Sequence, residues 1–338
     1  MKKIVSGLAL GASALLLVSA CGSSGSAASD AAGSVTAAKL AGPDYLPMLY
    51  SVENGVFKDK GLDVTLVDVV GPGPALSALA SNSVNMVDQT PTLAAQARER
   101  GDDVRMFCGI VPVQYNTIYA NKDVKLPNLQ EAGDWKSVVQ SWRGKDFGVP
   151  VLQGASQGVV EQLLNEAGVP LTDVTFVATG LGAQAVAALT SGSVDMTLTY
   201  PLQSELMHPS EAKLVLDLSK DVPDKINNVQ VLAWMANKAW LEGHADEATA
   251  WCEGIQVGID AIKDPANVDA VRRILSSQYG LTKDFQLDAA TRADNPLRVL
   301  STELNCSGIE ANLKASQARG VIKPETSTSC TDYIWTAN

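Results

Sequence analysis

A serine in a glycine-bounded turn is the residue of this sequence that most directly suggests chemistry. Ser156 is the third residue of the run Gly154-Ala155-Ser156-Gln157-Gly158, which follows the apolar stretch 147–152. A G-x-S-x-G turn between a strand and a helix is the nucleophile elbow of α/β-hydrolases. The acids and histidines that could complete a triad in the required order are Asp195, Asp217, His208 and His244. A serine esterase is therefore the alternative function.

Three features argue against this alternative. His208 precedes a proline in a polar stretch, and His244 lies in a polar segment typical of an exposed helix start. No HGGG-type oxyanion segment is present. The turn equivalent to Ser156 in an internal repeat, at residues 44–46, contains no nucleophile. We therefore predict no enzymatic activity and interpret Ser156 as a ligand-binding hydroxyl or a helix N-cap.

Polar and aromatic residues cluster in the turns that follow predicted strands, where open parallel sheets bind their ligands. The predicted ligand-binding residues are Asp44, Tyr45, Gly73, Pro74, Gln89, Thr90, Gln114, Tyr115, Gln153, Gly154, Ala155, Ser156, Thr199, Tyr200 and Asn228. None of these turns contains Arg, Lys or His, so an anion would be held by helix N-termini and hydroxyls. A neutral, polar aromatic ligand is the alternative. Each of these residues could instead have an ordinary role in a turn or helix cap. That alternative is weakest for Tyr45, Ser156 and Tyr200, and we expect these three residues to touch the ligand together.

An internal repeat in the sequence indicates where these turns lie between the predicted strands and helices. Residues 61–91 align without a gap with residues 171–201, at an offset of 110 and with 12 identities in 31 positions. Each copy contains a short β-branched strand, a glycine-containing turn, a helix and a second strand. Asn82 and Gly192 suit the C-terminal ends of the two helices. Further amphipathic helices are predicted upstream, at residues 49–57 and 159–167. Strands that alternate with helices indicate a parallel sheet in each copy.

A second internal sequence similarity indicates how the two units connect. Residues 113–122 resemble residues 229–238, and both runs are strand-like and follow a repeat unit. We interpret them as two crossover strands, one leaving the first lobe and one returning to it. The last third, from Trp240, is helical in pattern, with Ile255, Ile259 and Ile262 on one face. It should pack on the first lobe.

The N-terminus indicates export. Lys2 and Lys3 precede an uncharged apolar run at residues 8–18, too short for a permanent membrane span and typical of a signal peptide. The run ends in Val18-Ser19-Ala20-Cys21, which resembles a bacterial lipobox with Cys21 acylated. An ordinary signal peptide cleaved after Ala20 is the alternative. The Gly/Ser/Ala-rich segment that follows reads as a flexible tether.

Charge and cysteine content restrict the partners. The net charge of −11 disfavours nucleic acids and anionic lipid surfaces. Four cysteines follow Cys21, which suggests two disulfides in an exported protein, with three possible connectivities. Cys306 and Cys330 are close in sequence around a polar segment, so we predict that they pair, which leaves Cys108 for Cys252. With two histidines and no CxxC spacing, neither a metal site nor a cofactor is expected.

Residues 37–280 resemble the sulfonate/nitrate/taurine-type substrate-binding proteins, which include binders of thiamine-pyrimidine precursors. The resemblance depends on the runs at residues 45–47, 55–64, 75–86 and 144–156. It implies a type II periplasmic-binding-protein fold, in which two α/β lobes with mostly parallel sheets are joined by two crossovers around a ligand cleft. One departure is the turn at residues 71–74, Gly-Pro-Gly-Pro, where many relatives carry Ser or Thr, so the resemblance does not fix the ligand class.

The predicted organisation follows. Residues 1–20 form the signal peptide, 21–35 the tether, 36–115 with 235–338 the first lobe, and 116–234 the second. The expected function is that of a monomeric, extracytoplasmic binding protein, lipid-anchored to a bacterial cell membrane. It would deliver a small organic anion or polar aromatic compound to the permease of an ABC importer. A lipid-anchored esterase remains the alternative.

Overall fold

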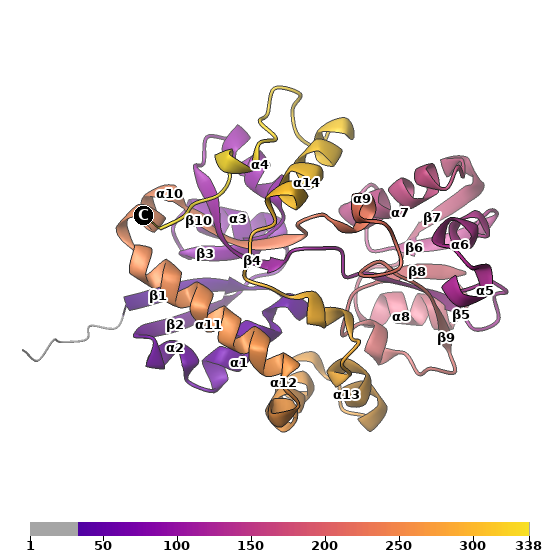
Figure 1. Ribbon diagram of the computed structural model, residues 1–338, viewed down its shortest axis with the longest axis horizontal. Coiled ribbons are helices and arrows are strands. Elements are labelled where there is room, and N and C mark those ends of the chain that lie inside the picture. Colours follow the sequence, from indigo (N-terminus) through magenta and orange to yellow (C-terminus); the bar gives the residue numbers. More distant parts are fainter. Residues whose placement is uncertain (1–32, 338) are drawn as a thin grey trace, which may run out of the picture. The chain divides into compact units, whose positions relative to one another are not determined.

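The computed structural model describes residues 33–337 of the chain (Figure 1). The predicted signal peptide, Cys21 and the tether up to residue 32 lie outside the described residues. The predicted tether extends to Val35, but Gly33–Val35 already belong to the first strand and pair with Leu62–Val64. This end of the prediction was wrong because small residues are compatible with a strand when a neighbouring strand supplies the hydrogen bonds.

The first sheet has the strand order β2-β1-β3-β10-β4. Its strands are β1 (Gly33–Lys39), β2 (Leu62–Asp68), β3 (Met86–Gln89), β4 (Val104–Val111) and β10 (Leu232–Asn237). β2, β1 and β3 are parallel, and β10 runs antiparallel between β3 and β4. Successive residues of β10 enter two different cores: Ala233 and Met235 one, Trp234 and Ala236 the other. Because side chains alternate along a strand, both faces of this sheet are covered.

Nine helices of the described chain belong to this first lobe. They are α1 (Leu46–Glu53), α2 (Val56–Asp59), α3 (Pro72–Ala80), α4 (Pro91–Glu99), α10 (Lys238–Gly243), α11 (Ala245–Lys263), α12 (Val268–Tyr279), α13 (Asp284–Thr291) and α14 (Cys306–Ala318). The predicted helix at 49–57 is in fact two, because Gly55 adopts a left-handed φ of 75° that interrupts it. α11 packs closely on α1, and a Cβ at Gly258 would collide with the Pro47 carbonyl group.

The second sheet repeats the same order as β7-β6-β8-β5-β9. Its strands are β5 (Thr117–Asn121), β6 (Lys145–Val149), β7 (Val174–Ala178), β8 (Met196–Thr199) and β9 (Ala212–Asp217). The accompanying helices are α5 (Leu129–Ala132), α6 (Trp135–Gln140), α7 (Ala155–Glu166), α8 (Ala183–Thr190) and α9 (Asp224–Asn227). Again the antiparallel strand, β5, lies between a parallel strand and the edge. We call this sheet and its helices the second lobe.

The structure confirms the internal repeat. β8 follows β3 at the predicted offset of 110 residues, and the two strands hold the same place in their sheets. Asn82 and Gly192, which match in the alignment, have left-handed φ values of 57° and 77° after α3 and α8. The second internal similarity, between residues 113–122 and 229–238, is confirmed as well, since β5 and β10 are the antiparallel strands that follow the two crossovers.

The crossovers join β4 to β5 through residues 112–116 and β9 to β10 through residues 218–231. The predicted return to the first lobe at residue 235 lies inside β10, which begins at Leu232. That boundary is therefore late by three residues, because β10 is paired with both neighbours before Met235. Both sheets belong to one unit of the chain.

Two disulfides are present, with the pairing that the sequence predicts. Cys108 of β4 is bonded to Cys252 of α11, and Cys306 at the start of α14 is bonded to Cys330. The predicted stripe Ile255, Ile259 and Ile262 of α11 is buried in the core that also contains Trp234. This places the helical last third on the first lobe, as expected. Among the helices of residues 33–337, none is long and apolar enough to span a membrane.

Candidate ligand-binding site

Turns at the carboxyl ends of strands from both sheets meet at one site. Asp44 and Tyr45 form the short 3₁₀ helix η1 (Pro43–Tyr45) after β1, and Asp88 lies near the end of β3. From the second lobe, Ser156 lies in the first turn of α7 after β6, and Tyr200 follows β8. Parallel strands bring their carboxyl ends to one edge of a sheet, which is why residues distant in sequence meet here.

A chain of contacts joins these residues across the two lobes. The hydroxyls of Ser156 and Tyr200 are 2.6 Å apart, at hydrogen-bonding distance. The ring of Tyr200 meets that of Tyr115 edge to face, with centroids 6.3 Å apart. Tyr115 lies in the first crossover, is 1% exposed and donates a long hydrogen bond of 3.4 Å to Asp44 Oδ1. The chain thus runs from helix α7 of the second lobe to the carboxyl group of Asp44 in the first.

Two carboxyl groups are buried at the first-lobe end. Asp44 is 4% exposed and Asp88 2%. No donor from residues 33–337 reaches either oxygen of Asp88. Burial and the neighbouring charge of Asp44 raise the pKa of Asp88 well above its ordinary value. Burial raises the pKa of Asp44 too, whereas the neighbouring Asp88 carboxyl, its own backbone amide and the Tyr115 hydroxyl lower it. Burial therefore disfavours ionisation of both groups, and most strongly that of Asp88.

Further tyrosines surround the carboxyl pair. Within the described part of the chain the hydroxyl of Tyr45 is buried without a well-formed hydrogen bond, although the Leu40 backbone lies near it. Burial and the charges of Asp88 and Asp44 raise the pKa of Tyr45 well above its usual value. The ring of Tyr45 packs edge-on against Trp234, with centroids 5.7 Å apart. Tyr279, from the end of α12, donates a 3.0 Å hydrogen bond to the Gly42 carbonyl, and burial, followed by Asp44, raises its pKa.

Other predicted site residues have structural partners. Thr199 is bonded to Thr117 between β8 and β5, and Thr90 caps α4 by accepting from the Leu93 amide. Asn228 is bonded to Asn305 in the second crossover. Gly73 and Pro74 are exposed in the first turn of α3, whereas Gln89 and Gln114 are buried. Gln114 Oε1 has no hydrogen-bond partner among residues 33–337. Gln153, Gly154 and Ala155 precede or begin α7, and Gln153 has a left-handed φ of 61°.

No catalytic triad forms around Ser156 in the described chain. Its hydroxyl is bonded to a tyrosine, whereas His208 is bonded to Ser210 and His244 to the Trp240 carbonyl. The context that makes G-x-S-x-G an esterase motif is therefore missing. Residues 33–337 also contain no group of three or more His, Cys, Asp and Glu side chains that could hold a metal ion.

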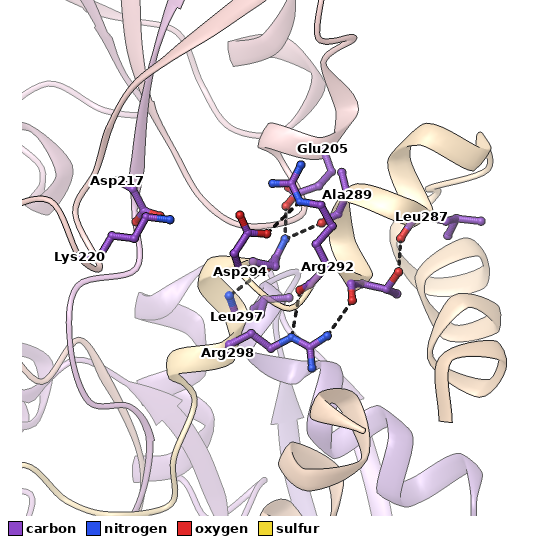
Figure 2. A network of polar contacts seen from close by, with 11 residues as sticks. Glu205, Asp217, Lys220, Leu287, Ala289, Arg292, Asp294, Leu297 and Arg298 are labelled. Atoms are coloured by element: carbon purple, nitrogen blue, oxygen red, sulfur yellow. Dashed lines mark hydrogen bonds and ion pairs between the residues drawn. The ribbon is translucent and has the colours of Figure 1, made fainter. Parts of the chain in front are cut away.

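Two contacts between the lobes were not predicted. Arg319, at the end of α14, donates to the carbonyls of Gln153 and Gly154 at distances of 3.3 and 3.2 Å. Asn295 donates to Glu205 Oε1 over 2.6 Å, and both side chains are buried. Figure 2 shows this polar network, with Glu205 of the second lobe facing the segment from Arg292 to Arg298. The C-terminal segment thus contacts the second lobe at two places.

The sequence contains a signal for Asp88, which is absent from the predicted ligand-binding residues. In the 110-residue repeat, Asp88 is aligned with Leu198, so an acid occupies a strand position that is apolar in the copy. Both strands are fully buried. A buried acid at the end of a strand, where the repeat has leucine, marks a position that packing does not explain. Tyr279, Asn295 and Arg319 had no such signal, because the repeat does not reach the C-terminal third.

A groove of about 410 Å³ elsewhere on the first lobe does not compete with this site. It lies beside α1 and α11 and is lined in part by Tyr50, Asp260 and Asp264. None of the buried polar atoms that lack a partner in the described chain belongs to its lining residues. The groove therefore shows no unmet hydrogen-bonding demand.

Known proteins resemble this chain in sequence and in structure. "Putative binding protein YtlA" of Bacillus subtilis is 23% identical over 214 residues, which are 62% of this chain and 60% of that relative. The chain thus spans less than two thirds of the relative's length. The structure of the periplasmic aliphatic sulphonate binding protein SsuA from Escherichia coli is similar, with a TM-score of 0.71 and 13% identity over 90% of this chain and 92% of that one.

The same fold also occurs in an enzyme. The desulfurization enzyme DszB is similar with a TM-score of 0.60 and 12% identity, over 88% of this chain and 95% of that one. At such identities the likeness shows the two-lobed periplasmic-binding-protein fold and no more. The model of the family described as NMT1/THI5 like matches residues 42–268, a range that includes Asp44, Asp88, Ser156 and Tyr200. The chain therefore belongs to the NMT1/THI5-like family.

Proposed function

We propose that this chain is the extracytoplasmic solute-binding protein of an ABC importer and performs no catalysis. The chain of contacts Ser156–Tyr200–Tyr115–Asp44 carries the proposal, because it joins turns of both sheets at the edge where such sheets bind ligands. The small-molecule ligand would lie between the lobes and pass to a membrane permease. Nucleic acids are not expected as partners, and the protein would act as a monomer.

The lobes would move about the two crossovers. We place the first lobe at residues 36–115 and 235–338 and the second at 116–234, with the small shifts at Gly33 and Leu232 noted above. A ligand that touches both lobes favours the closed arrangement by its differential affinity. Arg319 and Asn295 would strengthen that arrangement, since both reach the second lobe from the C-terminal segment.

Ligand-dependent closure tests the proposal. A ligand at a hundred times its dissociation constant should raise the free energy of unfolding by about 2.7 kcal/mol. Thermal shift against sulfonates, nitrate, aromatic carboxylates, pyrimidines and amines would identify it, and small-angle scattering should then show a smaller radius of gyration. A protein that neither gains stability nor changes its radius with any of these compounds would contradict a solute-binding role.

Ser156 distinguishes binding from hydrolysis. Ser156→Ala should weaken ligand binding by about 0.5–1.5 kcal/mol if its hydroxyl makes a direct neutral hydrogen bond. The measurement is calorimetry on both proteins, with an activated ester assayed in parallel. Wild type should show no esterase activity, so the variant should have none to lose. Hydrolysis by the wild type that disappears in Ser156→Ala would instead establish the esterase.

Lipidation of Cys21 is a separate part of the proposal, supported by the run Val18-Ser19-Ala20-Cys21 and the tether behind it. Mature protein from its native membrane should carry lipid on Cys21 as its N-terminal residue. Mass spectrometry of the N-terminal peptide measures this directly. A free thiol at Cys21, or a chain that starts beyond it, would rule the anchor out.

A further inference from the structure

We propose that the site binds a small monovalent organic cation, a protonated amine or a quaternary ammonium group, seated against Asp44 and Asp88. The inference rests on the proposed function and names the ligand class for the same site. It departs from the sequence-based expectation of an organic anion or polar aromatic compound. A polar aromatic compound fits if it carries a basic nitrogen, whereas an anion does not.

The first argument is that, within the described residues, the buried carboxyl pair has few hydrogen-bond donors and no cation beside it. Both side chains are more than nine-tenths buried, and neither oxygen of Asp88 has a partner within residues 33–337. Buried carboxylates in proteins are normally paired with a cation or with several hydrogen-bond donors. The side-chain hydrogen bond to this pair comes from the Tyr115 hydroxyl, and within residues 33–337 no Lys, Arg or His acts on either carboxyl group. A cationic ligand would supply the missing partner.

The second argument is the valence of the site. Because two neighbouring buried carboxyl groups do not readily ionise together, the pair carries one negative charge when either of them ionises. One positive charge on the ligand balances it. Because the described chain brings no third metal-ligating side chain to this pair, a divalent metal ion would lack ligands. An organic ammonium group needs only the charge and an enclosing surface.

The third argument is the aromatic enclosure. Tyr115, from the first crossover, donates a hydrogen bond to Asp44, Tyr45 adjoins Asp44 in η1, and Tyr200 packs edge to face with Tyr115. Trp234 supports Tyr45 from β10. The faces of aromatic rings attract cations, and rings around an anionic group form the usual cage for ammonium ligands. The hydroxyls of Ser156 and Tyr200 would then meet the polar end of the ligand.

The test uses matched probes on the purified full chain. Tetramethylammonium, choline, ethanolamine and benzylamine are measured by calorimetry and thermal shift up to 10 mM. They are compared with the neutral choline isostere 3,3-dimethylbutan-1-ol and with ethanesulfonate and nitrate as anions. We expect at least one cation to bind and its neutral or anionic counterpart to bind at least 100-fold more weakly.

Substitutions then test whether Asp44 and Asp88 supply the negative charge that binds the cation. Asp44→Asn/Asp88→Asn removes the negative charge while preserving shape, and should weaken cation binding at least 100-fold. Asp88→Asn alone leaves Asp44 ionised with an amide donor beside it, and should retain binding to within about tenfold. Asp63→Asn is the matched control, since Asp63 is exposed on β2 of the same sheet, and should bind as wild type does. Circular dichroism confirms that each variant is folded.

The outcomes separate this inference from the proposed function. Closure and stabilisation by an anion or a neutral compound, with no cation bound at 10 mM, would overturn the cation and leave the solute-binding role. A cation that binds the double variant as tightly as wild type would overturn the assignment to Asp44 and Asp88. If no compound of any charge binds or changes the radius of gyration, both proposals fail together.

Discussion

Replacing Cys108 and Cys252 together by alanine should lower the free energy of unfolding by about 5 kcal/mol in the chain-entropy model. This disulfide connects β4 to α11 across a sequence separation of 144 residues. The entropy that a cross-link removes from the unfolded chain grows with the loop it closes. Cys108 is also fully buried against the main core of the first lobe, so the loss of packing adds to the effect.

The second disulfide supplies the matched control. Cys306 and Cys330 are separated by 24 residues, for which the same model gives about 3.5 kcal/mol. Urea unfolding of the two double-alanine variants, each with one disulfide left, measures both values. The variant without Cys108–Cys252 should be the less stable by about 1.5 kcal/mol. Equal losses, or the reverse order, would show that loop entropy does not govern the stability of this fold.

Asp88→Asn should stabilise the unliganded protein at pH 8, by about 1–3 kcal/mol, the usual penalty of an unsatisfied buried polar group. The pKa of Asp88 is raised in the folded state, so its ionisation opposes folding. Its contribution to stability is complete below the ordinary aspartate pKa of about 4 and is lost as the pH rises through the folded value. The charged and titratable groups that face it are Asp44, Tyr45 and Tyr115.

The pH profile is the decisive measurement for this prediction. At pH 5 the amide and the protonated carboxyl should be nearly equivalent, since both are uncharged. Between pH 5 and pH 8 wild type should lose stability relative to Asp88→Asn, as followed by thermal unfolding at each pH. Asp63→Asn again serves as the exposed control and should show no such divergence. A variant that is less stable than wild type at every pH would mean that Asp88 is held by partners the structure does not show.

Much of the fold was predictable because the chain repeats itself. An ungapped offset of 110 residues fixed β2, β3, α3 and their copies, and it implied two sheets of one order. Boundaries were less predictable, because helix and strand ends depend on local backbone geometry and on pairing partners. Gly55 interrupts a helix through its φ value, and Gly33–Val35 form a strand only because β2 lies beside them.

The site was predictable where it is built by strand ends. Asp44, Tyr115, Ser156 and Tyr200 were all expected, and the structure brings them into one chain of contacts. The residues from the C-terminal third were not predictable. Tyr279, Asn295 and Arg319 reach the site or the second lobe through tertiary packing alone, and no periodicity or motif marks them.

The late position of β10 in the sequence has a consequence for how the chain is made and secreted. The other strands of the first sheet, β1 to β4, are all synthesised before residue 112. In contrast β10, which lies between β3 and β4 and pairs with both, is not complete until residue 237. All strands of the second sheet lie between residues 117 and 217. We therefore expect the second lobe to complete its pairing first while the chain emerges, with the edges of β3 and β4 open meanwhile. Over that interval Cys108 has no partner thiol, because Cys252, Cys306 and Cys330 all follow residue 237, so an oxidant that acts too early would couple it to a thiol of another molecule.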